Sequence, residues 1–295
     1  MTAGHLRVEI ADGIAELTLD RPAERNAFSG PMAVALADAY RESDARDDVR
    51  AVILTGAGNA FCVGADFTAG ADTFAKREEP EFSADPISFP PWQVRKPVIA
   101  AINGHAVGIG LTLAMQCDIR LVASDAKLAF AHVRRGVLPD AHSHWTVPRT
   151  IGFARAAELF LTGRYMSGDE AAAIGLASKA MPASEVLLAA RAMARDIATN
   201  CAPLSVALSK QLLWDASALT RDEIGARETA AHHQVMGRPD ALEGVMAFLE
   251  RRPPRWTLKV PRDWPEDPTG KVSEREAGAA AERLRAAGRK PKAET

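Results

Sequence analysis

The sequence predicts an α/β fold in which a mixed core is followed by a helical carboxy-terminal part. Two apolar runs without alternation, residues 51–54 and 98–102, are typical of strands buried on both faces. Strand and helix patterns alternate up to about Phe130, whereas helical patterns dominate beyond Gly152. We therefore expect an α/β core over residues 1–200, a helical subdomain over 201–258 and a peripheral extension over 259–295.

The first elements follow from local patterns. Alternating apolar residues predict strands at 6–10 and 15–19, joined by a turn at Asp12-Gly13 into a β-hairpin with one buried face. Ser29 is a candidate N-cap for a helix that runs from about Pro31 toward the charged stretch 41–50.

The later elements are read in the same way. Strands are expected at 119–122 and 128–130, after a helical run at 111–116. Ser167 and Glu170 have the spacing of a capping box ahead of a helix. Helical patterns cover 155–161, 171–176, 184–201, 221–235 and 239–249, and a surface helix is expected near 274–287. Pro253 and Pro254 end the last regular pattern before the extension.

Composition excludes several classes of function. The 295 residues carry a net charge of −2 without a basic patch of useful size, so we expect no nucleic-acid partner. No apolar run approaches the length needed to span a bilayer, and no secretion signal is seen, so we expect no membrane insertion. Three widely spaced cysteines offer neither a disulfide framework nor a CxxC metal site, which indicates a reduced, cytoplasmic location.

Two glycine-rich loops are the candidate sites for chemistry. Residues 56–67 and 103–110 each follow a buried strand, where backbone N–H groups can be left free to face a ligand. The second loop leads into a helix, whose first amides favour negative charge. The third glycine of a dinucleotide-binding fingerprint is missing, and no GxxxxGK[ST] loop is present. The loops therefore do not indicate a Rossmann or P-loop nucleotide site.

The order of these motifs resembles the enoyl-CoA hydratase/isomerase (crotonase) superfamily over residues 5–256. The resemblance rests on Arg21-Pro22 through Ala27, Ala60-Phe61-Cys62 through Asp66, residues 96–104 through Gly108-Ile109-Gly110, and Cys117-Asp118. It implies a crotonase-like spiral of repeated ββα units with a helical trimerisation region at the carboxyl end. It also implies an acyl-CoA thioester substrate, a homotrimer or hexamer, no metal, and no cofactor apart from the CoA of the substrate.

The resemblance also implies roles for individual residues. The backbone N–H groups of Ala65 and Ile109 would hold the thioester oxygen as it becomes an enolate oxyanion. The remaining substrate-binding positions implied for the CoA and acyl parts are Arg25, Ala27, Asp66, Phe67, Thr68, Gly108, Gly110, Thr112 and Phe248. The guanidinium of Arg25 suits a CoA phosphate, although a solvated arginine beside Glu24 is an equal alternative.

Departures from the family pattern bear on the reaction. Family hydratases use two glutamates, but Thr112 occupies the position of the first, and residues 130–135 lack the second. Asp140 matches the single catalytic carboxylate of some family isomerases and of a CoA-thioester dehalogenase. One carboxylate can move a proton from the α-carbon to the γ-carbon, so isomerisation or an atypical hydration is favoured over two-glutamate hydration.

Alternatives remain open at the level of sequence. Asp140 could instead be a turn or helix N-cap residue after Pro139. It could also attack carbon as the nucleophile of a hydrolase or dehalogenase. A catalytically degraded acyl-CoA-binding protein would equally explain Thr112 and the missing glutamate. His142 and His144 lie two residues apart without a third ligand at suitable spacing, so no metal site is predicted.

Overall fold

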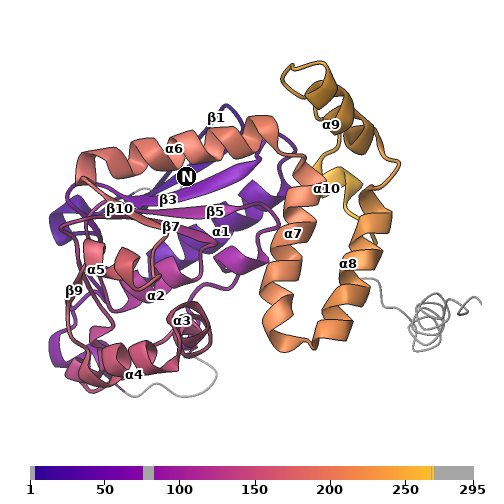
Figure 1. Cartoon of the computed structure of the whole chain (residues 1–295). Coiled ribbons are helices and arrows are strands. Elements are labelled where there is room, and N and C mark those ends of the chain that lie inside the picture. The colour runs from indigo at the N-terminus through magenta and orange to yellow at the C-terminus, as the bar shows by residue number, and fades with distance from the viewer. Residues whose placement is uncertain (1–3, 76–82, 267, 269–295) are drawn as a thin grey trace, which may run out of the picture. The chain divides into compact units, whose positions relative to one another are not determined.

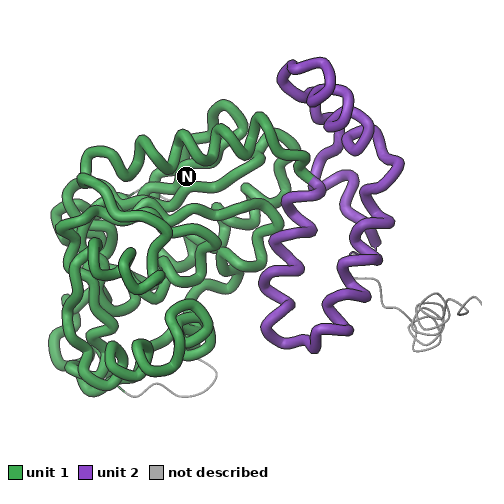
Figure 2. Tube along the Cα trace, in the orientation of Figure 1, with its two compact units in different colours: residues 1–203 green, residues 204–295 purple. Residues whose placement is uncertain are grey.

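The fold was analysed in a computed structural model, which describes residues 4–75, 83–266 and 268. The chain divides into two compact units, unit 1 over residues 1–203 and unit 2 over residues 204–295 (Figures 1 and 2). The division falls three residues after the expected end of the α/β core.

Unit 1 is built on two sheets. The larger has the strand order β1-β2-β3-β5-β7-β10, in which only the β1–β2 hairpin is antiparallel. Its strands are β1 (Leu6–Ala11), β2 (Ile14–Leu19), β3 (Ala51–Gly56), β5 (Val98–Ile102), β7 (Ile119–Ala123) and β10 (Lys179–Met181). The smaller sheet has the order β4-β6-β8-β9, with β4 (Ala60–Cys62), β6 (His105–Val107), β8 (Lys127–Ala129) and β9 (Met166–Ser167).

Consecutive strands are shared between the sheets in a repeated way. In the pairs β3–β4, β5–β6 and β7–β8, the first strand joins the large sheet and the second joins the small one. This confirms the spiral of repeated ββα units that the family resemblance implies. The glycine-rich loops at 56–67 and 103–110 lie at these crossings between the sheets, which brings them together in space.

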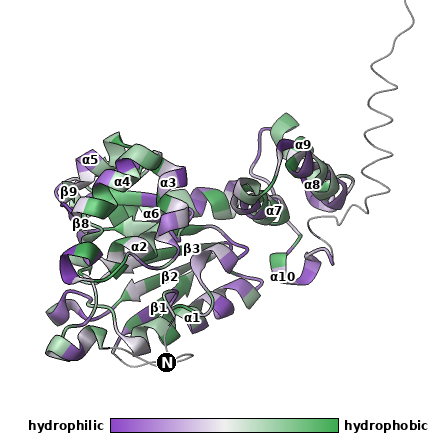
Figure 3. Ribbon diagram, turned by 90° about the horizontal axis from the view of Figure 1, so that it is seen from below, coloured by the Kyte–Doolittle hydropathy of each residue, from purple (hydrophilic) through white to green (hydrophobic). Residues whose placement is uncertain are grey.

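Helices cover the large sheet and fill the space between the sheets. The helices of unit 1 are α1 (Gly30–Ala45), α2 (Ile109–Met115), α3 (Ser143–Ile151), α4 (Phe153–Thr162), α5 (Gly168–Ala173) and α6 (Ala183–Asn200), with short 3-10 helices η1 (Pro22–Glu24), η2 (Gly70–Phe74), η3 (Pro91–Gln93) and η4 (Ala131–Arg135). Figure 1 shows α6 lying along one face of the large sheet. Every residue of α2 is buried, and its ribbon is coloured mainly as hydrophobic in Figure 3. Ser29 caps α1 as expected, because its side chain accepts the N–H of Met32.

Four expectations for unit 1 need correction. Val8 is 40% exposed, because β1 is an edge strand and only its Leu6 end is well covered. Strand β10 and helix α3 lie where no regular element was expected. Only half of the capping box at α5 forms: Ser167 accepts the N–H of Glu170, but the Glu170 carboxylate pairs with Arg164 at 2.6 Å.

Unit 2 is helical, with α7 (Pro203–Asp215), η5 (Ala216–Ala218), α8 (Arg221–Val235), α9 (Pro239–Leu249) and α10 (Val260–Asp263). The ranges expected for α8 and α9 are confirmed, whereas α7 was not predicted. Its apolar core is small, consisting of Leu204, Leu208, Ala231 and Leu258 with partly buried Leu212, Val235 and Trp264. Residues 259–266 belong to this unit and include α10, while the helix expected near 274–287 lies outside the described residues.

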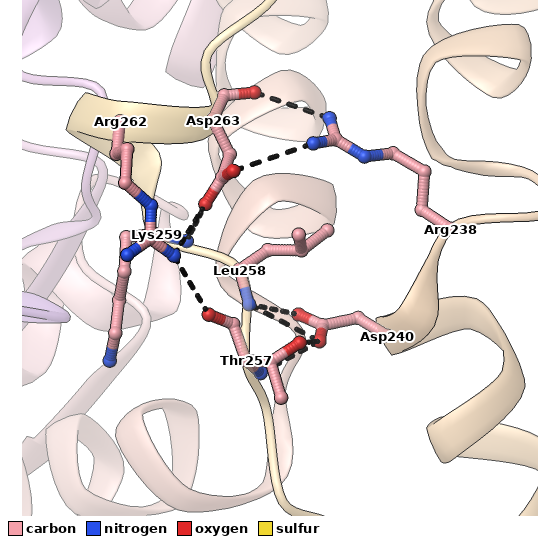
Figure 4. Close-up of polar contacts among 7 residues, drawn as sticks. All are labelled: Arg238, Asp240, Thr257, Leu258, Lys259, Arg262 and Asp263. Atoms are coloured by element: carbon pink, nitrogen blue, oxygen red, sulfur yellow. Dashed lines mark hydrogen bonds and ion pairs between the residues drawn. The ribbon is translucent and has the colours of Figure 1, made fainter.

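Carboxylates hold the segment that follows α9. Asp240, which is 5% exposed, accepts hydrogen bonds from the backbone N–H and hydroxyl of Thr257 and from the N–H of Leu258 (Figure 4). Asp263 accepts the N–H of Lys259 at 2.7 Å and pairs with Arg238 (Figure 4). No helix among the residues that the structure describes has both the length and the apolarity needed to cross a membrane.

Candidate functional site

A cavity of about 1770 Å³ opens in unit 1 beside the two glycine-rich loops. That volume exceeds the range of roughly 300–1,000 Å³ typical of small-molecule pockets, so it suits a long ligand. Nine of the residues predicted for catalysis or substrate binding line this cavity together: Arg25, Ala27, Ala65, Asp66, Phe67, Thr68, Gly108, Ile109 and Asp140. They come from segments up to 115 residues apart in sequence, from Arg25 to Asp140, so the fold is what assembles them.

The two glycine-rich loops approach each other closely at Gly64 and Gly108. Gly64 has φ +115° and Gly108 has φ +57° with ψ −129°, conformations that side chains rarely adopt. A Cβ placed on Gly108 would lie 3.8 Å from the Cα of Gly64. Phe28 fixes the first loop by donating its N–H to Gly64 and accepting that of Asp66. Within the described chain, neither the Ala65 nor the Ile109 N–H finds a protein acceptor, so two amides are available at the point where the loops meet.

Asp140 reaches the cavity from the segment between η4 and α3. Its side chain is 26% exposed, and its Oδ1 accepts the hydroxyl of Thr112 at 2.5 Å. Asp140 begins a turn, as one alternative predicts, because its carbonyl accepts the N–H of Ser143 at 2.9 Å. It does not cap a helix, since His142 occupies the N-cap of α3 and the Asp140 carboxylate bonds to Thr112. Oδ2 makes no hydrogen bond to any residue that the structure describes, which leaves it able to accept a proton from a ligand.

His132 lies beside this carboxylate. It is 8% exposed, lines the cavity, and its Nε2 lies 3.4 Å from Asp140 Oδ1. A Cβ on Gly108 would lie 3.8 Å from the same nitrogen. Neither ring nitrogen makes a hydrogen bond within the described part of the chain. Sequence reasoning could not distinguish His132 from a rim residue, since seven residues separate it from Asp140 and no regular pattern relates the two positions.

Three predicted residues are not among the residues of unit 1 that line the cavity. Gly110 is buried in α2, where a Cβ would overlap the carbonyl oxygen of Cys62. Thr112 is fully buried and is connected to the cavity through its bond to Asp140. Phe248 is 81% exposed and belongs to unit 2. Direct contact of these three with a substrate therefore stays a prediction.

The loop at 21–27 is fixed by polar contacts that the sequence did not reveal. The buried Asn26 side chain donates to the carbonyls of Ala57 and Ala60 and accepts the N–H of Arg21. The Arg21 guanidinium donates to Asp66 at 2.7 Å. The pKa of Asp66 is lowered by its hydrogen bond from the Thr68 N–H and by Arg21. Asp66 thus joins the loop at 56–67 to the loop at 21–27, whereas Arg25 is exposed and lines the cavity with its guanidinium unpaired among the described residues.

Cys62 is the cysteine of the glycine-rich loops, and its thiol is buried. Burial raises the pKa of the Cys62 thiol to about 12, so it is protonated at neutral pH. No group of three or more His, Cys, Asp or Glu side chains able to hold a metal is found among the described residues. His142 bonds to Asp85 at 3.1 Å, while the ring of His144 packs edge-on against Phe160.

Comparisons with known proteins agree on one family. A family profile described as enoyl-CoA hydratase/isomerase matches residues 9–259. An enoyl-CoA hydratase of Alternaria alternata is 38% identical over 248 residues, covering 83% of each chain. The crystal structure of a probable enoyl-CoA hydratase/isomerase from Mycobacterium abscessus has a TM-score of 0.83 and 51% identity, covering 85% of this chain and 98% of that one. An enoyl-CoA hydratase from Bacillus anthracis has a TM-score of 0.79 and 32% identity, with coverage of 85% and 98%.

Proposed function

The chain belongs to the enoyl-CoA hydratase/isomerase family, and from this premise we propose that it acts on acyl-CoA thioesters through an enolate. Asp140 is the proton carrier in this proposal, and the reaction is double-bond isomerisation or an atypical hydration. The observation that carries the proposal is the position of Asp140: its carboxylate lines the same cavity as two unpartnered backbone amides.

The amides of Ala65 and Ile109 are the proposed oxyanion hole. They come from separate loops that glycine brings into contact, so their direction is fixed before a ligand arrives. Amides held in place in this way stabilise a developing enolate oxygen without reorganisation, and each is typically worth about 3–4 kcal/mol in the transition state.

Asp140 is proposed to move one proton. In isomerisation of a 3-enoyl thioester, Oδ2 takes a proton from C2, the electrons move into the enolate, and the same carboxylic acid returns the proton to C4. Thr112 donates to Oδ1 and so orients the carboxylate while leaving Oδ2 for the substrate. The buried threonine at this position supplies no second carboxylate, which is why we favour this chemistry over two-glutamate hydration.

The rest of the cavity is proposed to hold the CoA. Arg25 lies on the cavity wall, where a guanidinium can make charge-assisted hydrogen bonds to a phosphate. Residues 65–68 line the cavity, and they offer backbone groups and the exposed Phe67 ring for the adenine. No separate cofactor is needed for these steps, and we place the enzyme in the cytoplasm.

Assembly as a homotrimer or a dimer of trimers is part of the proposal. Helix α9 exposes Leu242, Val245, Met246, Phe248 and Leu249, a larger apolar surface than a single helix usually leaves in water. Analytical ultracentrifugation of the full chain tests this point, because a monomer at micromolar concentration would contradict it.

The decisive experiment compares the wild type with Asp140→Asn. Asparagine keeps the shape and accepts the Thr112 hydroxyl, but it cannot take a proton. Both proteins are incubated with 2-enoyl-CoA and 3-enoyl-CoA thioesters, and products are identified by mass and chromatography. We expect turnover to fall by about 10²–10⁴-fold in the variant.

Each other outcome identifies an alternative. Undiminished turnover in Asp140→Asn would contradict the assignment of Asp140. An acyl-enzyme trapped by rapid quench would indicate a nucleophilic aspartate, and tight acyl-CoA binding without turnover of any thioester would indicate a degraded catalytic site.

A further inference from the structure

His132 has the features of a functional group rather than a packing residue. Burying an imidazole whose nitrogens make no hydrogen bond destabilises the folded state, so a histidine kept only for structure would use its ring nitrogens. Here both nitrogens are buried and make no hydrogen bond within the described chain, and the ring lines the cavity.

His132 lies beside both the Asp140 carboxylate and the proposed oxyanion hole. Nε2 lies 3.4 Å from Asp140 Oδ1 on one side. On the other side it lies against Gly108, the residue that precedes the proposed oxyanion donor Ile109. A ligand whose thioester oxygen reaches that amide would therefore have its C2–C3 bond close to both this nitrogen and the Asp140 carboxylate.

The geometry points to His132 and Asp140 as a two-residue acid/base pair for adding water to a 2-enoyl-CoA thioester. This inference rests on the proposed function and deepens it by naming the second proton carrier. In place of the two glutamates of the family hydratases, the pair has one carboxylate and one imidazole. One of these two groups carries a proton that it can give to the substrate, and the other is free to accept one.

The proposed step moves two protons. Nε2 of His132 takes a proton from water while the water oxygen bonds to C3, and the C2–C3 π electrons move onto the thioester oxygen at the Ala65 and Ile109 amides. Asp140, as the carboxylic acid, gives the proton on Oδ2 to C2 as the enolate collapses back to the thioester. The product is the 3-hydroxyacyl thioester, and the pair is left as imidazolium and carboxylate. Proton exchange between the two groups restores the starting state without any other reactant.

His132→Gln is the appropriate variant. Glutamine can place a polar group where Nε2 lies, but it cannot carry a proton. His233→Gln is the matched control, because His233 is exposed on α8 in unit 2. Two reactions are measured for each protein: hydration of a 2-enoyl-CoA, and exchange of the α-protons of a saturated acyl-CoA in D₂O, which needs only the enolate and Asp140.

We expect His132→Gln to lower kcat for hydration at least 100-fold with KM changed less than about threefold, while α-proton exchange stays within about threefold of wild type. Asp140→Asn should lose both reactions, and His233→Gln should lose neither. Retained hydration in His132→Gln would overturn the inference, as would equal loss of hydration and exchange, since the second result would mean that His132 only positions Asp140.

Failure of the inference is distinguishable from failure of the proposed function. A wild type that exchanges α-protons but hydrates no 2-enoyl-CoA would overturn the role of His132 and leave enolate chemistry intact. A wild type that does neither would contradict the proposed function itself. A stability measurement adds an independent test: His132→Leu should match or exceed the wild-type Tm, whereas a lower Tm would indicate that the imidazole serves the fold.

Discussion

The two glycine-rich loops of unit 1 meet through close backbone packing, whereas carboxylates hold the segment that follows α9 in unit 2. Around the cavity, Gly64, Gly108 and Gly110 lie where a side chain would be strained or would overlap a neighbouring carbonyl. In unit 2, Asp240 and Glu243 accept hydrogen bonds from backbone N–H groups of residues 255–258, beside an apolar core of only a few side chains. The contact between the two glycine-rich loops therefore depends mainly on space, and the segment after α9 depends on charged acceptors.

The largest effect is expected from Gly110→Ala. The new methyl group would overlap the Cys62 carbonyl in a part of the fold that is fully buried, so α2 or β4 must shift. We expect a loss of at least about 3 kcal/mol in the free energy of unfolding of unit 1, together with loss of turnover. Hydrogen exchange of the α2 amides measures this effect.

Gly225→Ala is the matched control in unit 2. This helical glycine has no atom within 4 Å of an added Cβ, so alanine should stabilise α8 by about 0.5–1 kcal/mol. If Gly110→Ala and Gly225→Ala changed the free energy of unfolding equally, the proposed difference between the two units would be wrong.

A smaller loss is expected from Asp240→Ala. The substitution leaves the N–H groups of Thr257 and Leu258 without their acceptor in a buried setting. We expect a loss of about 2 kcal/mol, seen as faster proteolysis near residues 255–262. Asp240→Asn keeps one acceptor oxygen, so its rate of proteolysis should lie between those of the wild type and Asp240→Ala. If Asp240→Ala were cleaved as slowly as the wild type, packing of Leu258 alone would be enough to hold the segment.

The smallest effect is a dependence on pH in unit 2. The pKa of Glu243 is lowered to about 2 by hydrogen bonds from Arg252 and the Arg255 N–H. Because this folded-state value lies below the ordinary value of 4.5, the contribution to stability is complete above about pH 4.5 and is lost as the pH falls toward 2. Thermal unfolding between pH 5 and pH 2 should show a shallower pH dependence in Glu243→Gln, and identical curves would contradict the assignment.

Much of the fold was predictable because patterns among residues close in the sequence determine its main strands and helices. The buried strands β3 and β5, the Ser29 cap of α1 and the ranges of α8 and α9 follow from burial on both faces, capping chemistry and helical period. Helix α3 and strand β10 were not predictable in this way. Strand β10 is a three-residue segment at the edge of the large sheet, and it acquires its role only by pairing with β7.

For the candidate site, the sequence was enough to name the components: two glycine-rich loops, an aspartate after Pro139, and a threonine where a glutamate is expected. The tertiary structure was needed to show that Thr112 donates to Asp140, that Gly110 packs behind the cavity instead of lining it, and that His132 faces the carboxylate. Capping and periodicity act between residues close in the chain, whereas contacts between α2, η4 and the loop before α3 depend on how the two sheets cross.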